Sequence, residues 1–246
     1  MSRAEERRES RETGSDMKKF YMLFAAVAVI GIGVVGFNVG SGVMGTAVSE
    51  PIELDLSDND ALVQLAQGMT KGDPEAPVTI VEFGDFQCPA CSGFALSHKP
   101  QVELGLVETG QAKFVFYDFP IPSIHPNSFL ASRAARCSTD QDKYWEYHDS
   151  LFRNQARWAA SPNPTGLFED YADEIGMDKG DFAACLSSDK YADVVTANME
   201  LGSRMGITGT PTVLINANNE TRRVNYDYQS IVAGIEMIMS GGPGGN

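Results

Sequence analysis

The sequence predicts an α/β domain in which a block of helices interrupts a small sheet. Three observations predict it. Two β-rich apolar runs flank a helical stretch in the first half, helical patterns fill the middle, and two strands and a helix close the domain. With 43% hydrophobic and 21% charged residues, the 246-residue chain has a globular composition. Its formal net charge of −14 repels phosphate backbones and argues against a nucleic-acid partner.

The first half reads as strand, helix, strand. Residues 78–86 and 113–119 are the apolar runs, and residues 88–109 form a helical pattern that we expect Pro100 to interrupt. A unit of this length forms a parallel strand pair with a right-handed crossover. A short helix over residues 59–70 is expected ahead of it. Its inward-facing residues would be Ala61, Leu62, Leu65 and Ala66.

The middle of the chain carries five helical patterns, with Gly and Pro at their boundaries. They cover residues 126–137, 143–157, 165–175, 179–186 and 189–205. Residues 211–216 then predict a strand, residues 222–226 its partner across an Asn-rich turn, and residues 228–239 a closing helix. This order is typical of a thioredoxin-like fold with a helical domain inserted over about residues 123–205.

An uncharged apolar run, residues 20–37, precedes the domain. At about 1.5 Å of rise per residue, roughly eighteen to twenty-two such residues cross a hydrocarbon layer of about 30 Å. Lys18 and Lys19 stand before the run and acid follows it, so the positive-inside rule leaves the N-terminus in the cytoplasm. We therefore expect a transmembrane anchor. A cleaved signal peptide with Gly45-Thr46-Ala47 near its cleavage site is the alternative, and it also exports the domain.

These patterns divide the chain into five parts. They are a cytoplasmic tail (1–19), a transmembrane anchor (20–40), a tether (41–67), the folded domain (68–240) and a flexible Gly-rich tail (241–246).

The motif Cys88-Pro89-Ala90-Cys91 stands where the first apolar strand ends and the helix begins. A helix N-terminus carries partial positive charge and unpaired N–H groups that stabilise a thiolate, so Cys88 is the expected nucleophile. Pro89 suits the first turn because its missing N–H is not needed there. Cys91 lies one turn further on and can close a small ring with Cys88. The pair is therefore expected to accept and donate disulfides.

Half of a zinc site and a pair of inert thiols are the alternative interpretations. A zinc site would need a second closely spaced pair, whereas Cys137 and Cys185 lie far from each other and from the first pair. Four cysteines are also too few for a disulfide scaffold. We therefore expect redox chemistry, with no metal and no organic cofactor.

The segment from Phe86 to Cys91, followed much later by Gly209-Thr210-Pro211-Thr212, resembles the DsbA-like thiol:disulfide oxidoreductases of the thioredoxin superfamily. The two motifs are specific as a pair, and the resemblance covers about residues 70–240. Further agreeing segments are Asp118-Phe119-Pro120, Ile124-His125-Pro126, Trp145-Glu146-Tyr147-His148-Asp149 and residues 182–186.

The resemblance implies a substrate site beside the cysteine pair. In that family the proline that matches Pro211 has a cis peptide bond and faces the pair, which leaves backbone groups free to hold substrate as an added strand. Thr210, Pro211, Pro89 and Ala90 are the residues expected to contact substrate. From the residues alone, Pro211 also fits an ordinary trans proline at a strand start. The family's strongest oxidants carry His where this chain has Ala90, which leaves its oxidising strength open.

Glu82 interrupts the apolar strand six residues before Cys88. A carboxylate in a central strand is desolvated, which raises its pKa. The matching acidic residue of the family lies beneath the cysteine pair and helps to move protons, so the resemblance implies a catalytic role for Glu82. A carboxylate at an edge or on the surface is the alternative, with Asp85 nearer to the pair in sequence.

The resemblance also implies a second, structural disulfide between Cys137 and Cys185. Two buried cysteines of an exported domain join when their Cα atoms come within about 7 Å. Two separate cysteines that pack as small apolar groups are the alternative. His148 shares a helix face with Trp145 and Phe152, so we expect it to pack in the core.

The predicted function is that of a membrane-anchored, extracytoplasmic thiol:disulfide oxidoreductase that introduces disulfides into exported proteins. Its expected partners are exported cysteine-containing polypeptides, a membrane redox partner that recycles the pair, and the membrane through residues 20–40. A reductase or isomerase of exported thiols is one alternative. A non-enzymatic module, either a metal carrier or a peptide-binding chaperone, is the alternative of another class.

Overall fold

The computed structural model describes residues 47–240. The predicted cytoplasmic tail, the predicted anchor over 20–40 and the Gly-rich tail lie outside these residues. Between Ala47 and Ser240, no helix has the length and apolar character needed to cross a membrane.

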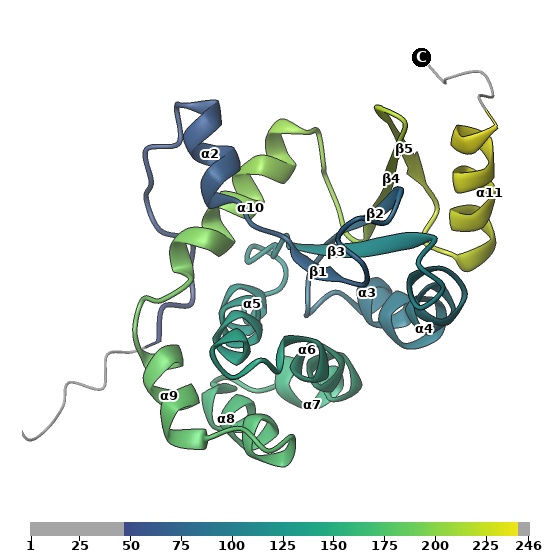
Figure 1. Ribbon diagram of the computed structural model, residues 1–246. Coiled ribbons are helices and arrows are strands. Elements are labelled where there is room, and N and C mark those ends of the chain that lie inside the picture. The colour runs from purple at the N-terminus through teal and green to yellow at the C-terminus, as the bar shows by residue number, and fades with distance from the viewer. Residues whose placement is uncertain (1–46, 241–246) are drawn as a thin grey trace, which may run out of the picture. The chain divides into compact units, whose positions relative to one another are not determined.

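A five-stranded sheet in the order β1-β3-β2-β4-β5 forms the centre of the described domain (Figure 1). Its strands are β1 (Met69–Lys71), β2 (Val78–Gly84), β3 (Ala112–Asp118), β4 (Thr212–Ala217) and β5 (Glu220–Val224). β2 pairs with β3 in parallel, and every other pair is antiparallel. Because β2 occupies the middle of the sheet, the residues that follow it emerge at the centre of the fold.

Helices cover both faces of the sheet. After β2 the chain forms α3 (Pro89–Gly93) and α4 (Lys99–Val102), and at the end it forms α11 (Tyr228–Met239), which packs against β4, β5 and α4. The inserted helices follow β3 (Figure 1). They are α5 (Ser128–Cys137), α6 (Tyr144–Arg153), α7 (Gln155–Ala159), α8 (Thr165–Glu174), α9 (Lys179–Ser187) and α10 (Ala192–Arg204).

Alternating residues of β2 point to two different cores. Val78, Ile80 and Glu82 face the larger core, which includes the cysteine pair, α6 and α11. Phe83 faces a smaller core that α10 closes. At that crossing Gly202 is required, because a Cβ there would lie 2.6 Å from the Phe119 ring.

The helix after β2 continues through Pro100, which contradicts the predicted interruption. Two π-helical turns, Phe94–His98 and Glu103–Val107, flank α4. Proline has no N–H to donate within a helix, and the widened turn before α4 absorbs this defect without ending the helix.

The single helix predicted over 143–157 is two helices. α6 ends at Arg153, and α7 begins at Gln155 after a turn at Asn154. The Ser150 carbonyl accepts hydrogen bonds from both the Asn154 N–H, at 3.0 Å, and the Asn154 side-chain Nδ2, at 2.9 Å, so both donors of Asn154 bind the last turn of α6.

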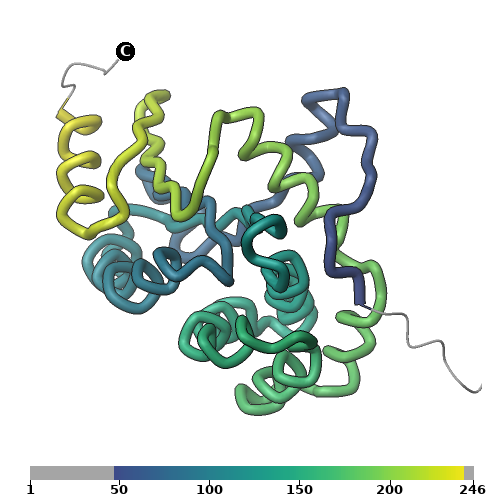
Figure 2. The backbone as a smooth tube through the Cα atoms, turned by 180° about the vertical axis from the view of Figure 1, so that it is seen from behind, coloured from purple at the N-terminus to yellow at the C-terminus, as the bar shows by residue number. Residues whose placement is uncertain are grey.

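Residues 47–67, assigned in the sequence to a tether, form part of the folded unit. Residues 47–58 run beside α10 (Figure 2), where the Ile52 N–H donates to Thr196 Oγ1 over 3.2 Å. α2 (Asn59–Leu65) follows, and Leu62 and Ala66 pack against α10. Ala61 is exposed rather than inward, because a neighbour of Leu62 is rotated by about 100° around the helix. The three-residue strand β1 was not predicted.

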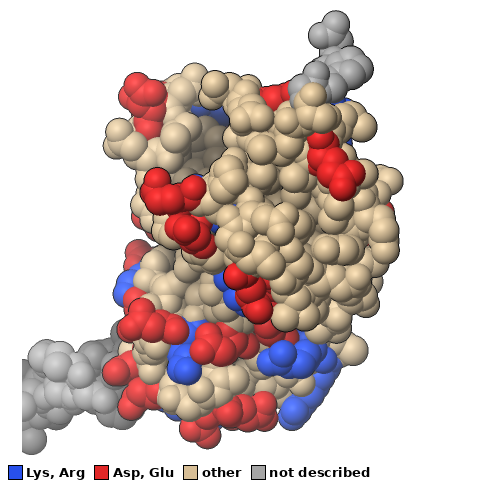
Figure 3. All heavy atoms as spheres, turned by 45° about the vertical axis from the view of Figure 1, so that its right-hand side comes forward, with Lys and Arg blue, Asp and Glu red and all other residues tan. Residues whose placement is uncertain are grey.

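Figure 3 shows one face of the domain, on which acidic side chains are scattered and the basic side chains form small separate groups. No continuous basic stripe crosses this face.

Candidate active site

The cysteine pair lies at the N-terminus of α3, directly after the loop that leaves β2. Cys88 is the N-cap residue in extended conformation, and Pro89 occupies the first turn. Both cysteines are free thiols in this structure. The Cys88 residue keeps 8% of its surface exposed, whereas Cys91 keeps 0%. Only Cys88 is therefore open to a partner thiol.

The two thiols differ in acidity. A hydrogen bond from the Cys91 thiol, the N–H groups of Cys91 and Ala90, and a contact with Thr210 together lower the pKa of Cys88 to about 5. Burial raises the pKa of Cys91 well above its usual range, and the charges of Glu82 and Cys88 add to the increase. Near neutral pH the pair therefore holds one thiolate and one thiol.

The loop before β4 faces the pair. The Cys88 Sγ lies 3.4 Å from the Thr210 carbonyl oxygen, and the Thr210–Pro211 peptide bond is cis, as the resemblance implied. Thr212 fixes the loop by donating from Oγ1 to the Gly209 carbonyl over 2.8 Å. The four expected substrate contacts thus surround Cys88. Pro89 is exposed, and Ala90, Thr210 and Pro211 are half-buried.

Glu82 is fully buried in the central strand, so the surface alternative for this carboxylate is wrong. Burial, opposed by the charge of Lys99 and aided by the charge of Cys88, raises its pKa to about 8. Neither carboxyl oxygen has a hydrogen-bond partner in the described part of the chain. Glu82 is therefore a protonated acid near neutral pH, within electrostatic reach of both cysteines.

Asp85 holds the loop between β2 and α3, a role that the sequence analysis did not predict. Its N–H donates to the Cys91 Sγ over 3.5 Å. Its buried carboxylate accepts hydrogen bonds from the N–H groups of Gln87, at 2.7 Å, and Ile121, at 2.9 Å. The Nδ1 atom of His125 lies 2.7 Å from the same carboxylate.

Gln155, the first residue of α7, ties the helical insertion to the Cys88 loop. Its Nε2 donates to the carbonyl oxygens of Phe86, at 2.7 Å, and Cys88, at 2.9 Å. In return, the side-chain oxygen of Gln87 accepts from the Asn127 N–H over 2.7 Å. Sequence reasoning missed the roles of both glutamines, because these contacts exist only once the insertion folds back onto the loop before Cys88.

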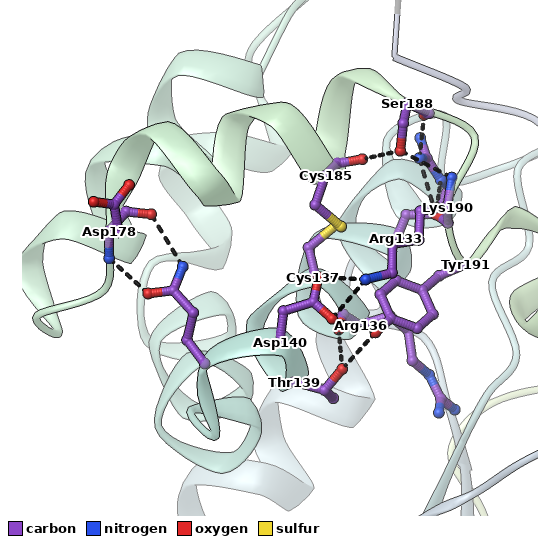
Figure 4. A network of polar contacts seen from close by, with 11 residues as sticks. Arg133, Arg136, Cys137, Thr139, Asp140, Asp178, Cys185, Ser188, Lys190 and Tyr191 are labelled. Atoms are coloured by element: carbon purple, nitrogen blue, oxygen red, sulfur yellow. Dashed lines mark hydrogen bonds and ion pairs between the residues drawn. A yellow bond between two sulfur atoms is a disulfide. The ribbon is translucent and has the colours of Figure 1, made fainter.

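The two remaining cysteines form a second disulfide at a distance from the candidate active site. Cys137 ends α5 and Cys185 lies in α9, and their sulfur atoms are bonded at 2.02 Å with the Cα atoms 5.8 Å apart (Figure 4). The bridge therefore joins two inserted helices.

Arg133, one turn before Cys137, binds the segment that follows Cys185 (Figure 4). Its guanidinium donates to the carbonyl oxygens of Leu186, Ser188 and Lys190. It also donates to the Val48 carbonyl over 2.8 Å. The disulfide and the guanidinium thus fasten α5, the end of α9 and the N-terminal segment at one place.

Among residues 47–240, no group of three or more His, Cys, Asp or Glu side chains is arranged to hold a metal ion.

A central strand that delivers a cysteine pair to a helix N-terminus, opposite a cis-proline loop, defines a thioredoxin-type redox fold. A family model described as Thioredoxin matches residues 64–233. Disulfide bond formation protein D of Bacillus subtilis is 30% identical over 191 residues, which cover 74% of this chain and 83% of that protein. The chain belongs to the DsbA-like thiol:disulfide oxidoreductases of the thioredoxin superfamily.

Solved structures and longer relatives are also similar. Oxidised BdbD from Bacillus subtilis superposes with a TM-score of 0.63 at 26% identity, over 79% of this chain and 99% of that chain. Wolbachia pipientis alpha-DsbA1 shares the fold, with a TM-score of 0.61 at 21% identity, over 71% of this chain and 92% of that chain. The Na(+)/H(+) antiporter NhaA 1 of Salinispora arenicola is 28% identical over 171 residues, or 70% of this chain. The match spans only 24% of that antiporter's length.

Proposed function

We propose that the protein is an extracytoplasmic thiol:disulfide oxidoreductase that introduces disulfides into exported polypeptides. The observation that carries the proposal is the asymmetry of the pair: an accessible Cys88 with a pKa of about 5 beside a buried Cys91 whose pKa is raised. The name of the Bacillus subtilis relative, a disulfide bond formation protein, supports the same chemistry.

The proposed reaction starts from the Cys88–Cys91 disulfide. A client thiolate attacks the Cys88 Sγ, the bond between the two cysteines breaks, and Cys91 leaves with the electron pair and takes a proton from Glu82. A second client thiolate then attacks the client sulfur of the mixed disulfide, and Cys88 leaves as a thiolate. The client gains one disulfide, and the pair gains the two electrons.

The stabilised Cys88 thiolate favours the oxidising direction. Any interaction that stabilises the reduced pair makes its disulfide a stronger oxidant. In a two-electron couple, about 1.4 kcal/mol of such stabilisation raises the reduction potential by about 30 mV. Clients would pair with the half-buried backbone beside Pro211 as an added strand. A membrane redox partner would return the pair to its disulfide form, and residues 20–40 would hold the domain outside the cytoplasmic membrane.

The test is the reduction potential of the full-length protein in glutathione buffers. A potential near those of known oxidases, about −120 mV, supports the proposal, and a value near about −270 mV would instead indicate a reductase. Trapping with cysteine-containing clients tests the chemistry itself. Cys91→Ser should accumulate mixed disulfides, whereas its matched control Cys88→Ser should trap none. The absence of mixed disulfides in Cys91→Ser would exclude disulfide exchange through Cys88.

A further inference from the structure

Two fully buried polar side chains carry atoms that have no hydrogen-bond partner. Glu82 and His148 both have 0% of their surface exposed. In the described part of the chain, both carboxyl oxygens of Glu82 and the Nε2 atom of His148 lack a hydrogen-bond partner. Buried polar atoms are rarely left unsatisfied, so such a pair requires an explanation.

The two side chains lie on the same face of the sheet. Glu82 on β2 stands in register with Phe116 on β3, so their side chains are neighbours on the face of the larger core. The His148 ring packs edge-on against Phe116, with ring centroids 5.0 Å apart, and against Phe86, at 5.4 Å. Phe116 thus contacts the imidazole and adjoins Glu82.

The unpartnered atoms are chemically complementary. Burial raises the pKa of Glu82 to about 8, so the acid carries a proton to donate near neutral pH. Burial lowers the pKa of His148 to about 4, so its imidazole is neutral. Its Nδ1 lies 2.9 Å from the Asp149 carboxylate, which fixes the proton on Nδ1 and leaves a lone pair on Nε2.

Asp149 contacts both this imidazole and solvent. Its side chain is 33% exposed, and it also lies 3.0 Å from the Nζ of the buried Lys99. Lys99 in turn pairs with Glu103 at 2.7 Å, and Glu103 with Lys71 at 2.7 Å. His148 is therefore surrounded by aromatic side chains on one side and linked through Asp149 to a charged cluster at the surface on the other. The cluster consists of Asp149, Lys99, Glu103 and Lys71.

The charged groups that face the two side chains come from several elements. Glu82 interacts with Cys88 and Cys91 at α3, with Lys99 on α4 and with Tyr144 on α6. His148 interacts with Asp149, Lys99 and Glu103. Lys99 acts on both, and its positive charge favours a carboxylate on Glu82 and a neutral imidazole on His148.

We propose that His148 and Asp149 form a proton relay that connects Glu82, and through it Cys91, to solvent. The inference rests on the proposed function and adds two residues that position and pass a proton without touching the reacting sulfur atoms.

In the direction in which Cys91 attacks, the protonated Glu82 first passes its proton to His148 Nε2, directly or through one water molecule, while the Nδ1 proton moves to Asp149 and then to solvent. The Glu82 carboxylate that results takes the proton of the Cys91 thiol. The imidazole thereby exchanges one tautomer for the other, and no net charge stays on it. When Cys91 leaves as a thiolate, every step runs in reverse.

The test follows the two phases in which the reduced full-length protein reacts with dithiobis-nitrobenzoate. In the first phase Cys88 attacks the reagent, and in the second Cys91 releases nitrothiobenzoate from Cys88. We expect His148→Phe and Asp149→Asn to slow the second phase about tenfold or more near neutral pH and to leave the first unchanged. The solvent deuterium effect on the second phase should also change.

The control is His98→Gln, which alters another histidine with an unpartnered ring nitrogen. It should leave both phases and the deuterium effect unchanged. An unchanged second phase in Asp149→Asn, or equal slowing of both phases in His148→Phe, would overturn the relay. A normal second phase in Glu82→Gln would overturn it as well, while Cys88 exchange would stand. A wild-type protein that releases no nitrothiobenzoate would instead contradict the proposed function.

Discussion

Cys88 and Cys91 are three residues apart, yet their positions on α3 give them different reactivity. Cys88 precedes the first helical turn and contacts the cis-proline loop, whereas Cys91 lies inside the larger core. We expect an alkylating reagent to modify Cys88 first, with a pH profile centred near the pKa of about 5. Mass spectrometry of peptides from the reduced protein measures this. Faster modification of Cys91 would contradict the assignment.

Glu82 should make stability depend on pH. Its pKa is raised from 4.5 unfolded to about 8 folded, so its stabilising contribution is complete below about pH 4.5 and is lost as pH rises through about 8. Glu82→Gln removes this dependence. Relative to wild type, the variant should therefore gain free energy of unfolding as the pH rises from about 4.5 to about 8, as measured by urea unfolding. The exposed Glu146→Gln is the control. A constant difference between wild type and Glu82→Gln would show that the carboxyl ionises freely.

At the scale of elements, α7 supports the loop that holds Cys88 through the Gln155 side chain. Gln155→Leu leaves the carbonyl groups of Phe86 and Cys88 without their side-chain donor. We expect the free energy of unfolding to fall by about 1–3 kcal/mol, the cost of leaving buried acceptors unsatisfied. Gln101→Leu is the control, because its amide binds the Ser97 carbonyl at an exposed site. An equal fall in the free energy of unfolding in the two variants would show that the Gln155 contact stabilises the domain no more than an exposed hydrogen bond does.

The disulfide between α5 and α9 should stabilise the domain more strongly than the hydrogen bonds of Gln155 do. It closes a loop with a sequence separation of 48 residues. On the chain-entropy estimate, Cys137→Ala together with Cys185→Ala should lower the free energy of unfolding by about 4 kcal/mol. Denaturant unfolding of the oxidised protein measures the loss. A double variant that unfolds at the wild-type midpoint would contradict this value.

The same bridge should also resist a mild reductant that opens the Cys88 pair. Cys137 ends its helix, where the partial negative charge disfavours a thiolate, whereas Cys88 begins one. Alkylation at graded dithiothreitol concentrations compares the two disulfides. Release of Cys137 and Cys185 before Cys88 and Cys91 would refute this order.

Sequence patterns predicted most elements because hydrophobic periodicity reports burial directly. The apolar run that became β2 and the helical positions of His148 and Phe152 are examples. The patterns failed where a distant contact decides the structure. β1 is three residues long and exists only through pairing with β3. Asp85 and Gln155 act on neighbours that no local pattern identifies.

For the whole molecule, the reduced form should be more stable than the oxidised form, and the difference should depend on pH. The Cys88 pKa is lowered from 9.0 to about 5, so its stabilising contribution is present above about pH 9 and is lost as pH falls through about 5. The oxidised form lacks this titration. Urea unfolding of both forms should show a difference that shrinks on acidification. A difference that grows toward pH 5, or an oxidised form that is the more stable one, would contradict the oxidase proposal.

The attachment of residues 47–58 has a mechanical consequence. The Val48 carbonyl is bound by Arg133 on α5, and Val48 and Ile52 pack beside Phe129 and α10. A pull on the N-terminal end of the described chain would first load α5 and α10, and the Cys137–Cys185 bridge joins α5 to α9. The helical insertion would therefore bear tension applied to residues 47–58. The strand β2 and the loop that holds Cys88 would not be distorted.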